Sequence, residues 1–195
     1  MTSPTGSNSP IPVRMPVTSG LIRRARPGDI DEILAMVREL AEYERLADQA
    51  VATPAQFHAA LFGASPSVYA FVVDDDPDAG TLAGFAIYFL NFSTWLGVHG
   101  LYLEDLYVRP QFRGRGFGKR LLATMARVCV DEGYGRVEWW VLDWNVAALA
   151  VDESIGAVPM DEWTVQRVTG QALIDLAAQA DPLPAVPPAQ HGPPT

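Results

Sequence analysis

The sequence has almost no cysteine and no long hydrophobic run. Cys129 is the only cysteine among 195 residues, so an intramolecular disulfide is excluded, which is typical of a protein in a reducing compartment. No apolar segment approaches the ~20 residues that a helix needs to cross a bilayer. Residues 1–20 are rich in Ser, Thr, Pro and Gly and lack the apolar stretch of a secretory signal. We therefore expect a cytoplasmic protein without a membrane span.

Positive charge is also scarce. The chain has 14 Lys and Arg residues against 23 Asp and Glu, which gives a formal net charge of −9. Nucleic-acid binding requires a basic face, so we expect no nucleic-acid partner. A negative field attracts cations and suits a small cationic substrate, although net acidity also serves solubility alone. The three histidines form no His-x₃-His pair, and no metal site is expected.

The hydrophobic content, 49%, is that of a globular protein with a real core. Two segments fall outside this pattern. Residues 1–20 and 179–195 are poor in core-forming side chains, and six of the sixteen prolines lie between Asp181 and Thr195. Such segments do not bury enough apolar surface to fold, so we expect both tails to be disordered. The folded domain is assigned to residues 21–178.

Within this domain, short apolar runs and amphipathic segments follow one another, as in a mixed α/β protein. Apolar residues at helical spacing predict helices at 27–44, 53–62, 119–130, 145–154 and 172–178. Continuous apolar runs predict strands at 21–25, 68–73, 82–90, 98–108, 136–142 and 163–168. The acidic segment Asp74–Gly80 is expected to be a solvated turn, because a calcium loop would need a closing glutamate. Cys129 falls on the apolar face of its helix and is expected to be packed rather than catalytic.

A loop rich in glycine and arginine connects the strand that ends at Val108 to the next helix. It contains Gly114, Gly116 and Gly118, and glycines allow several backbone N–H groups to point into one concavity. The helix N-terminus and the side chains of Arg113, Arg115, Lys119 and Arg120 add positive charge. The segment therefore predicts a pyrophosphate site. It is neither a Walker loop, which ends in Gly-Lys-Ser/Thr, nor the dinucleotide fingerprint, whose glycine spacing differs.

The run Arg113-Gly114-Arg115-Gly116-Phe117-Gly118 resembles the Arg/Gln-x-x-Gly-x-Gly/Ala motif of the GNAT acetyltransferase superfamily, and the order of expected elements resembles the GNAT fold. Four other segments resemble the diamine (spermidine/spermine-type) acetyltransferases within it: 39–44, 84–89, 95–97 and 101–108, together with Trp144-Asn145. The likeness extends over residues 21–177. It implies an α/β (α+β) GNAT fold, with a mixed, mostly antiparallel twisted sheet flanked by helices.

The resemblance also implies a reaction and a set of roles. The reaction is direct acetyl transfer from acetyl-CoA to a primary amine of a small cationic substrate, by a homodimer and without a metal. Glu104 would remove the amine proton. Glu44 and Asp105 would bind the cationic substrate, with Glu42 as a further candidate, and Tyr43 and Trp95 would line its channel. The acetyl-CoA-binding residues would be Leu106, Tyr107, Val108, Arg113, Gly114, Arg115, Gly116, Phe117, Gly118, Lys119 and Asn145.

The sequence departs from the family pattern on one helix. Asp152 stands where the family has a tyrosine that protonates the leaving thiolate, and Ala150 stands where an asparagine often contacts CoA. A positioned acid contributes about 10²–10⁴-fold, so a slower enzyme is one interpretation. A CoA-binding or regulatory module without catalysis and a protein-lysine acetyltransferase are the alternatives.

Overall fold

We describe a computed structural model in which residues 21–76 and 80–181 are placed. Most of both expected tails, at 1–20 and 182–195, and residues 77–79 of the acidic turn lie outside the described residues. The contacts divide the chain after Trp139 into two units. Each unit is described by itself.

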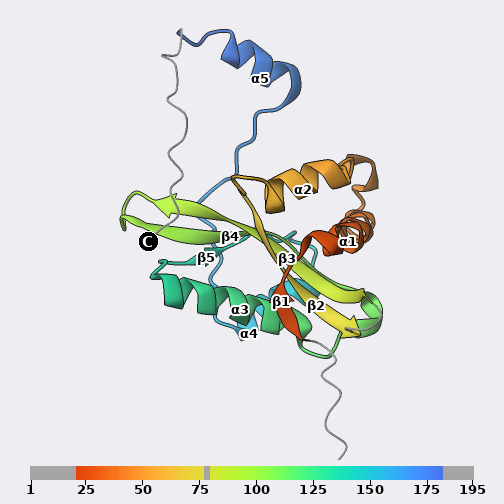
Figure 1. Ribbon diagram of the computed structural model, residues 1–195. Coiled ribbons are helices and arrows are strands. Elements are labelled where there is room, and N and C mark those ends of the chain that lie inside the picture. The colour runs from red at the N-terminus through yellow and green to blue at the C-terminus, as the bar shows by residue number, and fades with distance from the viewer. Residues whose placement is uncertain (1–20, 77–79, 182–195) are drawn as a thin grey trace, which may run out of the picture. The chain divides into compact units, whose positions relative to one another are not determined.

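The first unit is built on one mixed sheet of five strands (Figure 1). The strands lie in sequence order. The first four are antiparallel to their neighbours, whereas the last pairs with the fourth in parallel. They are β1 (Ile22–Arg24), β2 (Tyr69–Asp76), β3 (Thr81–Ser93), β4 (Val98–Val108) and β5 (Val137–Glu138). The predicted mixed, mostly antiparallel sheet is thus confirmed.

Helices cover both faces of this sheet. The longer helices are α1 (Ile30–Tyr43), α2 (Pro54–Phe62) and α3 (Phe117–Glu132), and the short 3-10 turns are η1 (Pro27–Asp29), η2 (Ala47–Gln49) and η3 (Pro110–Phe112). Alternate strand residues point to opposite faces, so the sheet supplies two separate apolar layers. One layer packs under α3 and the other under α1 and α2.

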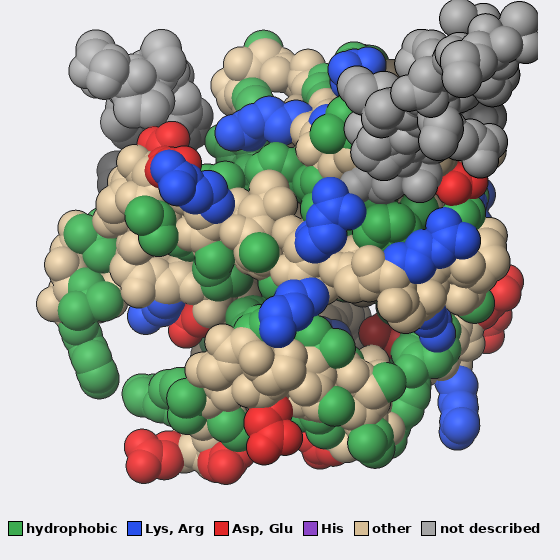
Figure 2. All heavy atoms as spheres, turned by 90° about the horizontal axis from the view of Figure 1, so that it is seen from below, with side chains coloured by type: hydrophobic (Ala, Val, Ile, Leu, Met, Phe, Trp, Pro, Cys, Tyr) green, Lys and Arg blue, Asp and Glu red, His purple; other side chains and the backbone are tan. Residues whose placement is uncertain are grey.

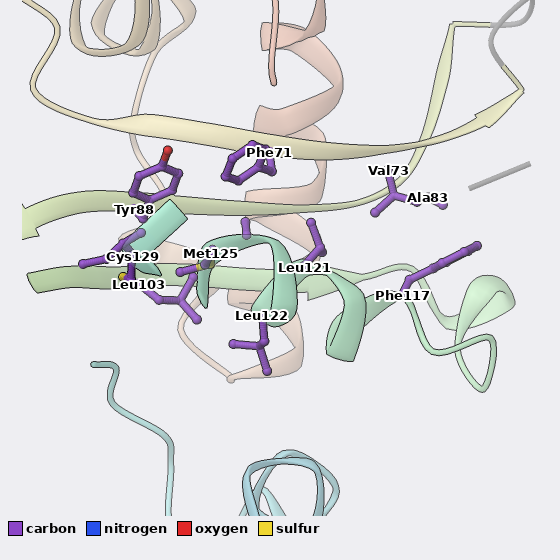
Figure 3. Packing of buried hydrophobic residues seen from close by; sticks show 12 residues of the cluster. Phe71, Val73, Ala83, Tyr88, Leu103, Phe117, Leu121, Leu122, Met125 and Cys129 are labelled. Carbon is purple, nitrogen blue, oxygen red and sulfur yellow. The ribbon is translucent and has the colours of Figure 1, made fainter. Parts of the chain in front are cut away.

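The two layers can be followed through neighbouring residues. On the α3 side, Phe71 and Tyr88 stack with ring centroids 5.5 Å apart, and Met125 of α3 is fully buried against this cluster (Figure 3). On the other side, Val72 and Phe85 are fully buried with Ile33 and Met36 of α1. Cys129 is buried in the α3 layer, which confirms that its thiol is packed.

The acidic turn after β2 differs from the prediction. Asp74 was expected to be solvated, but it lies in β2 and is buried. The Arg23 guanidinium of β1 donates to the Asp74 carboxylate at 2.8 Å and to Asp29 of η1 at 2.7 Å. A carboxylate tolerates burial when such a partner compensates its charge. This arginine therefore connects β1 to β2 and to the start of α1, and the two carboxylates raise its pKa further.

The second unit contains two helices, α4 (Val146–Ser154) and α5 (Gly170–Ala177), close to the predicted ones. Two strand predictions are wrong. The strand expected at 136–142 is reduced to the two residues of β5, and no strand forms at 163–168. A strand exists only where another strand offers it a hydrogen-bonding ladder. Past Glu138, no described residue has such a partner.

Two features are absent from the described residues. No helix there has both the length and the apolar character needed to cross a membrane. No group of three or more His, Cys, Asp or Glu side chains there could hold a metal ion.

Candidate active site

The most distinctive feature of β4 is a bulge at Glu104. Asp105 pairs with Ile87 and Leu103 pairs with Tyr88, so Glu104 has no opposite residue on β3. A bulge resets the alternation of side chains along a strand. Asp105 consequently shares the face of Ile87, under α1, whereas Leu103 lies in the α3 layer. Glu104 itself is exposed.

Three of the predicted carboxylates gather at this bulge. Glu44 caps the C-terminus of α1 and is half-buried, as is Asp105. Burial, followed by the negative charges of Glu104 and Glu44, raises the pKa of Asp105 to about 6. Burial also raises the pKa of Glu44. Like charges held together in a desolvated site favour a bound cation.

The glycine loop has the conformation of an anion site. Gly114 and Gly116 both have φ of 76°, which side chains rarely adopt, and Gly116 is the N-cap of α3. The first N–H groups of a helix have no intrahelical acceptor, so those at the start of α3 are available to a ligand. Arg115 and Lys119 are exposed there, whereas Phe117 is buried and anchors the first turn. Figure 2 views the molecule from below Figure 1, the side on which α3 is drawn, and shows basic side chains spread over this face.

Arg113 makes a different set of contacts. Its Nε donates to the carbonyl oxygen of Val108 at 2.9 Å. Its guanidinium lies 5.3 Å from the ring centroid of Tyr43 and 5.6 Å from that of Tyr107. The loop is thereby in contact with both α1 and β4.

One edge of β4 is open over its last residues. On its β3 side, the strand is paired from Val98 to Val108. On its other side, only Leu101 and Tyr102 pair with β5. In the described part of the chain, no strand pairs with Leu106–Val108 on that edge, and this segment leads into the glycine loop. An extended ligand arm can add to such an edge through backbone hydrogen bonds.

Residues that the sequence did not single out hold this region together. Arg109, directly after β4, forms ion pairs with Glu32 at 2.7 Å and Glu39 at 3.0 Å, and it also donates to the Leu82 carbonyl at 3.0 Å. These contacts fasten α1 to the end of β4. Both acids lie 70 or more residues before Arg109 in the sequence, so no local spacing indicates that they pair with it.

Trp95 is not brought to the carboxylates within this chain. It lies in the β3–β4 turn and is 87% exposed. Six residue steps along β3 separate the Ile87–Asp105 pair from the Ser93–Val98 pair next to this turn. At about 3.4 Å per residue, the turn is about 20 Å along the sheet from Asp105. Glu42 is exposed on α1.

The predicted residues of the second unit lie on α4. Asn145 is the N-cap of this helix, and its side chain accepts a hydrogen bond from the Ala148 N–H at 3.3 Å. This is the usual function of asparagine at a helix start. Asp152 is half-buried on the same helix.

A glycine loop at a helix N-terminus and an open strand edge suit a phosphate-bearing ligand with an extended arm, and a carboxylate cluster lies on the same strand. The sequence pattern of the Acetyltransferase (GNAT) family matches residues 33–156. The chain is 36% identical to the thialysine N-epsilon-acetyltransferase of Sus scrofa in an alignment 171 residues long, which covers 84% of this chain and 100% of the relative. It is 32% identical to the L-ornithine N5-acetyltransferase NATA1 of Arabidopsis thaliana, over 89% of this chain and 96% of that one.

Solved acetyltransferase and related structures have the same fold as this chain. An integron cassette protein from the mobile metagenome of V. cholerae superposes with a TM-score of 0.68 at 25% identity, over 82% of this chain and 98% of the other. An aminoglycoside acetyltransferase from an uncultured soil sample shares the fold, with a TM-score of 0.63 at 16% identity, over 78% and 95% of the two chains. The chain therefore belongs to the GNAT family and is an N-acetyltransferase.

Proposed function

We propose that the chain moves an acetyl group from acetyl-CoA directly to a primary amine of a small cationic substrate, such as a polyamine, a diamine or a lysine-like amino acid. One observation carries this proposal. Glu104 and Asp105, on the strand that leads into the glycine loop, gather with Glu44 at the end of α1, so a carboxylate cluster suited to a cation lies beside a loop suited to phosphates.

The donor site is assigned to the open edge of β4 and the glycine loop. Acetyl-CoA is the co-substrate of the family, and the residues present fit it. The backbone of Leu106, Tyr107 and Val108 would bind the pantetheine arm, because this edge lacks a strand partner among the described residues. The N–H groups from Gly114 to Lys119 and the charges of Arg113 and Arg115 would hold the pyrophosphate. We also assign Asn145 to this site from the family likeness.

The acceptor site is assigned to the carboxylates. An alkyl ammonium with a pKa near ~10 must lose a proton before its nitrogen can attack a thioester carbonyl. Glu104, exposed at the bulge, is the proposed base, directly or through a water molecule. Asp105 and Glu44 would hold the cationic remainder of the substrate. In the reaction, an N–C bond forms, the C–S bond breaks, and the thiolate takes up a proton.

The proton for the thiolate need not come from a tyrosine. Asp152 occupies the position of the family's tyrosine, and water protonates a thiolate leaving group without further help. We therefore propose an active enzyme that is slower than relatives which have the tyrosine. The experiment below tests catalysis directly.

The substrate range is proposed from the relatives. Those named above act on thialysine and ornithine, and spermidine/spermine N(1)-acetyltransferase-like protein 1 of Homo sapiens is 30% identical over 80% of this chain and 23% of that protein. Thialysine, ornithine, spermidine and spermine each have a primary amine beside further charged groups. From the family likeness we also propose a cytoplasmic homodimer, to be checked by light scattering of the purified protein.

The first experiment is thiol release by the purified protein with acetyl-CoA and a panel of diamines, polyamines, thialysine, ornithine and lysine. We expect release with at least one of these amines. Glu104→Gln should lower kcat by about 10²-fold or more and remove the acidic limb of the pH profile. Glu132→Gln, at the exposed end of α3, is the matched control and should behave like the wild type.

Two outcomes would overturn these assignments. Intact CoA binding by calorimetry with no release for any amine would favour the non-catalytic module or a protein-lysine substrate. A wild-type pH profile in Glu104→Gln would remove Glu104 from the role of base.

A further inference from the structure

The Arg113 side chain connects two parts of the protein that are far apart in sequence. Its Nε donates to Val108 at the end of β4, which fixes the side chain relative to the strand. Its guanidinium then lies within 5.3 and 5.6 Å of the ring centroids of Tyr43 and Tyr107. Cations at this distance from an aromatic ring are attracted by its quadrupole.

The two rings differ in how firmly they are held. Tyr107 is buried in β4, and its hydroxyl interacts with Glu39, which in turn pairs with Arg109. Tyr43 is the last residue of α1 and is 38% exposed. Tyr107 therefore offers a fixed ring, whereas Tyr43 presents its ring from the helix end that also carries Glu44.

We propose that Tyr43 and Tyr107 form an aromatic clamp on Arg113, and that this clamp positions the glycine loop for acetyl-CoA. Tyr43 is then a positioning residue of the cofactor site rather than only a lining of the amine channel. Because Glu44 follows Tyr43 directly, the clamp also ties the substrate carboxylates to the loop.

The clamp predicts an effect that a channel lining would not produce. A tyrosine that only contacts the amine changes the KM for the amine and leaves CoA binding intact. A tyrosine that holds Arg113 changes CoA binding when no amine is present. The inference rests on acetyl-CoA binding at the glycine loop, which is part of the proposed function.

The test is calorimetric titration of the full chain with CoA in the absence of any amine. Tyr43→Leu removes the ring and should weaken CoA binding by about two- to five-fold, the size of one exposed cation–π contact. Tyr43→Phe keeps the ring and should bind CoA as the wild type does. Thermal unfolding of each variant checks that the substitution at this partly exposed site has not disturbed the fold.

A double-mutant cycle then identifies Arg113 as the partner. Arg113→Gln keeps a donor for the Val108 carbonyl but loses the cation. In that background, Tyr43→Leu should have no further effect on the Kd of CoA. An undiminished effect there, wild-type CoA binding by Tyr43→Leu, or a Tyr43→Phe variant as weak as Tyr43→Leu would each overturn the clamp.

The failure of the clamp and that of the donor site are distinguishable. If the wild-type chain does not bind CoA, the donor site itself is wrong. If the wild type binds CoA and Tyr43→Leu binds it equally well, only the clamp is wrong.

Discussion

At the scale of single residues, Asp105 combines a structural cost with a proposed role in substrate binding. Its pKa is raised because burial and the charges of Glu104 and Glu44 disfavour the ionised form. A carboxylate that is destabilised in the free protein is stabilised when a cation arrives. Sites that bind charged substrates often keep such unfavourable groups at the expense of stability.

Removing the Asp105 charge should therefore stabilise the free protein. The pKa is raised from 3.8 to about 6 on folding, so ionisation opposes folding. The cost is absent below pH about 4, grows between pH about 4 and 6, and is complete above that range. At pH 7.5 we expect Asp105→Asn to raise the free energy of unfolding by about 2 kcal/mol in urea titrations, and the gain should vanish near pH 4.

The same variant should lose substrate affinity, with a larger rise in the KM for a polyamine than fall in kcat. Asp161→Asn, at an exposed position of the second unit, is the control and should change neither quantity. An Asp105→Asn protein that is no more stable at pH 7.5 than the wild type, or that has an unchanged KM, would contradict this assignment.

At the scale of elements, much of the fold could be predicted because its signals are local. The apolar run of β4 and the amphipathic pattern of α3 each reflect the layer that the element packs against. The prediction of a strand at 163–168 was wrong because a β-forming composition does not supply a neighbouring strand to pair with. The Asp74–Arg23 and Glu39–Arg109 pairs were missed because they join positions 51 and 70 residues apart.

The sequence predicted the continuous part of the site but not the contacts between distant segments. The glycine loop is a continuous segment, so its sequence pattern and helix start are visible together. The approach of Glu44 to Asp105 depends on how α1 lies on the sheet, where buried apolar contacts and the Arg109 ion pairs hold it. The contact of Arg113 with Tyr43 and Tyr107 could not be predicted, because a basic side chain in a phosphate loop gives no indication of which rings it meets.

The loop geometry itself is open to a test at the element scale. Gly116→Ala places a side chain at φ of 76°, which costs about 1–2 kcal/mol unless the loop changes shape. We expect the KM for acetyl-CoA to rise several-fold, measured by initial rates. Gly133→Ala is the matched control, because Gly133 ends the same helix at φ of 68° with open space around it. Equal increases in KM for the two variants would exclude a specific role for the loop at Gly116.

At the scale of the whole molecule, the formal net charge is −9, whereas the proposed substrate is a cation. A field of this sign speeds the encounter with positively charged ligands, and salt screens it. We expect kcat/KM for a diamine to fall severalfold between about 0.02 M and about 0.5 M salt, measured by thiol release. A matched monoamine should respond less, because it carries half the charge. Equal salt dependence for the two amines would show that the overall charge serves solubility alone.

The bulge at Glu104 has a consequence for how this strand can vary in length. Leu103 and Leu106 both lie on the α3 side although three positions separate them, because Glu104 takes up one step of the alternation. Deleting that residue would restore the regular alternation, because Leu103 and Asp105 already pair with consecutive residues of β3; Asp105 would still oppose Ile87, and Leu106 would stay on the α3 side. The proposed base is therefore an insertion into the strand that the pairing itself does not require. The β3–β4 ladder would keep its register without this position, which contributes an exposed carboxylate and no cross-strand pair.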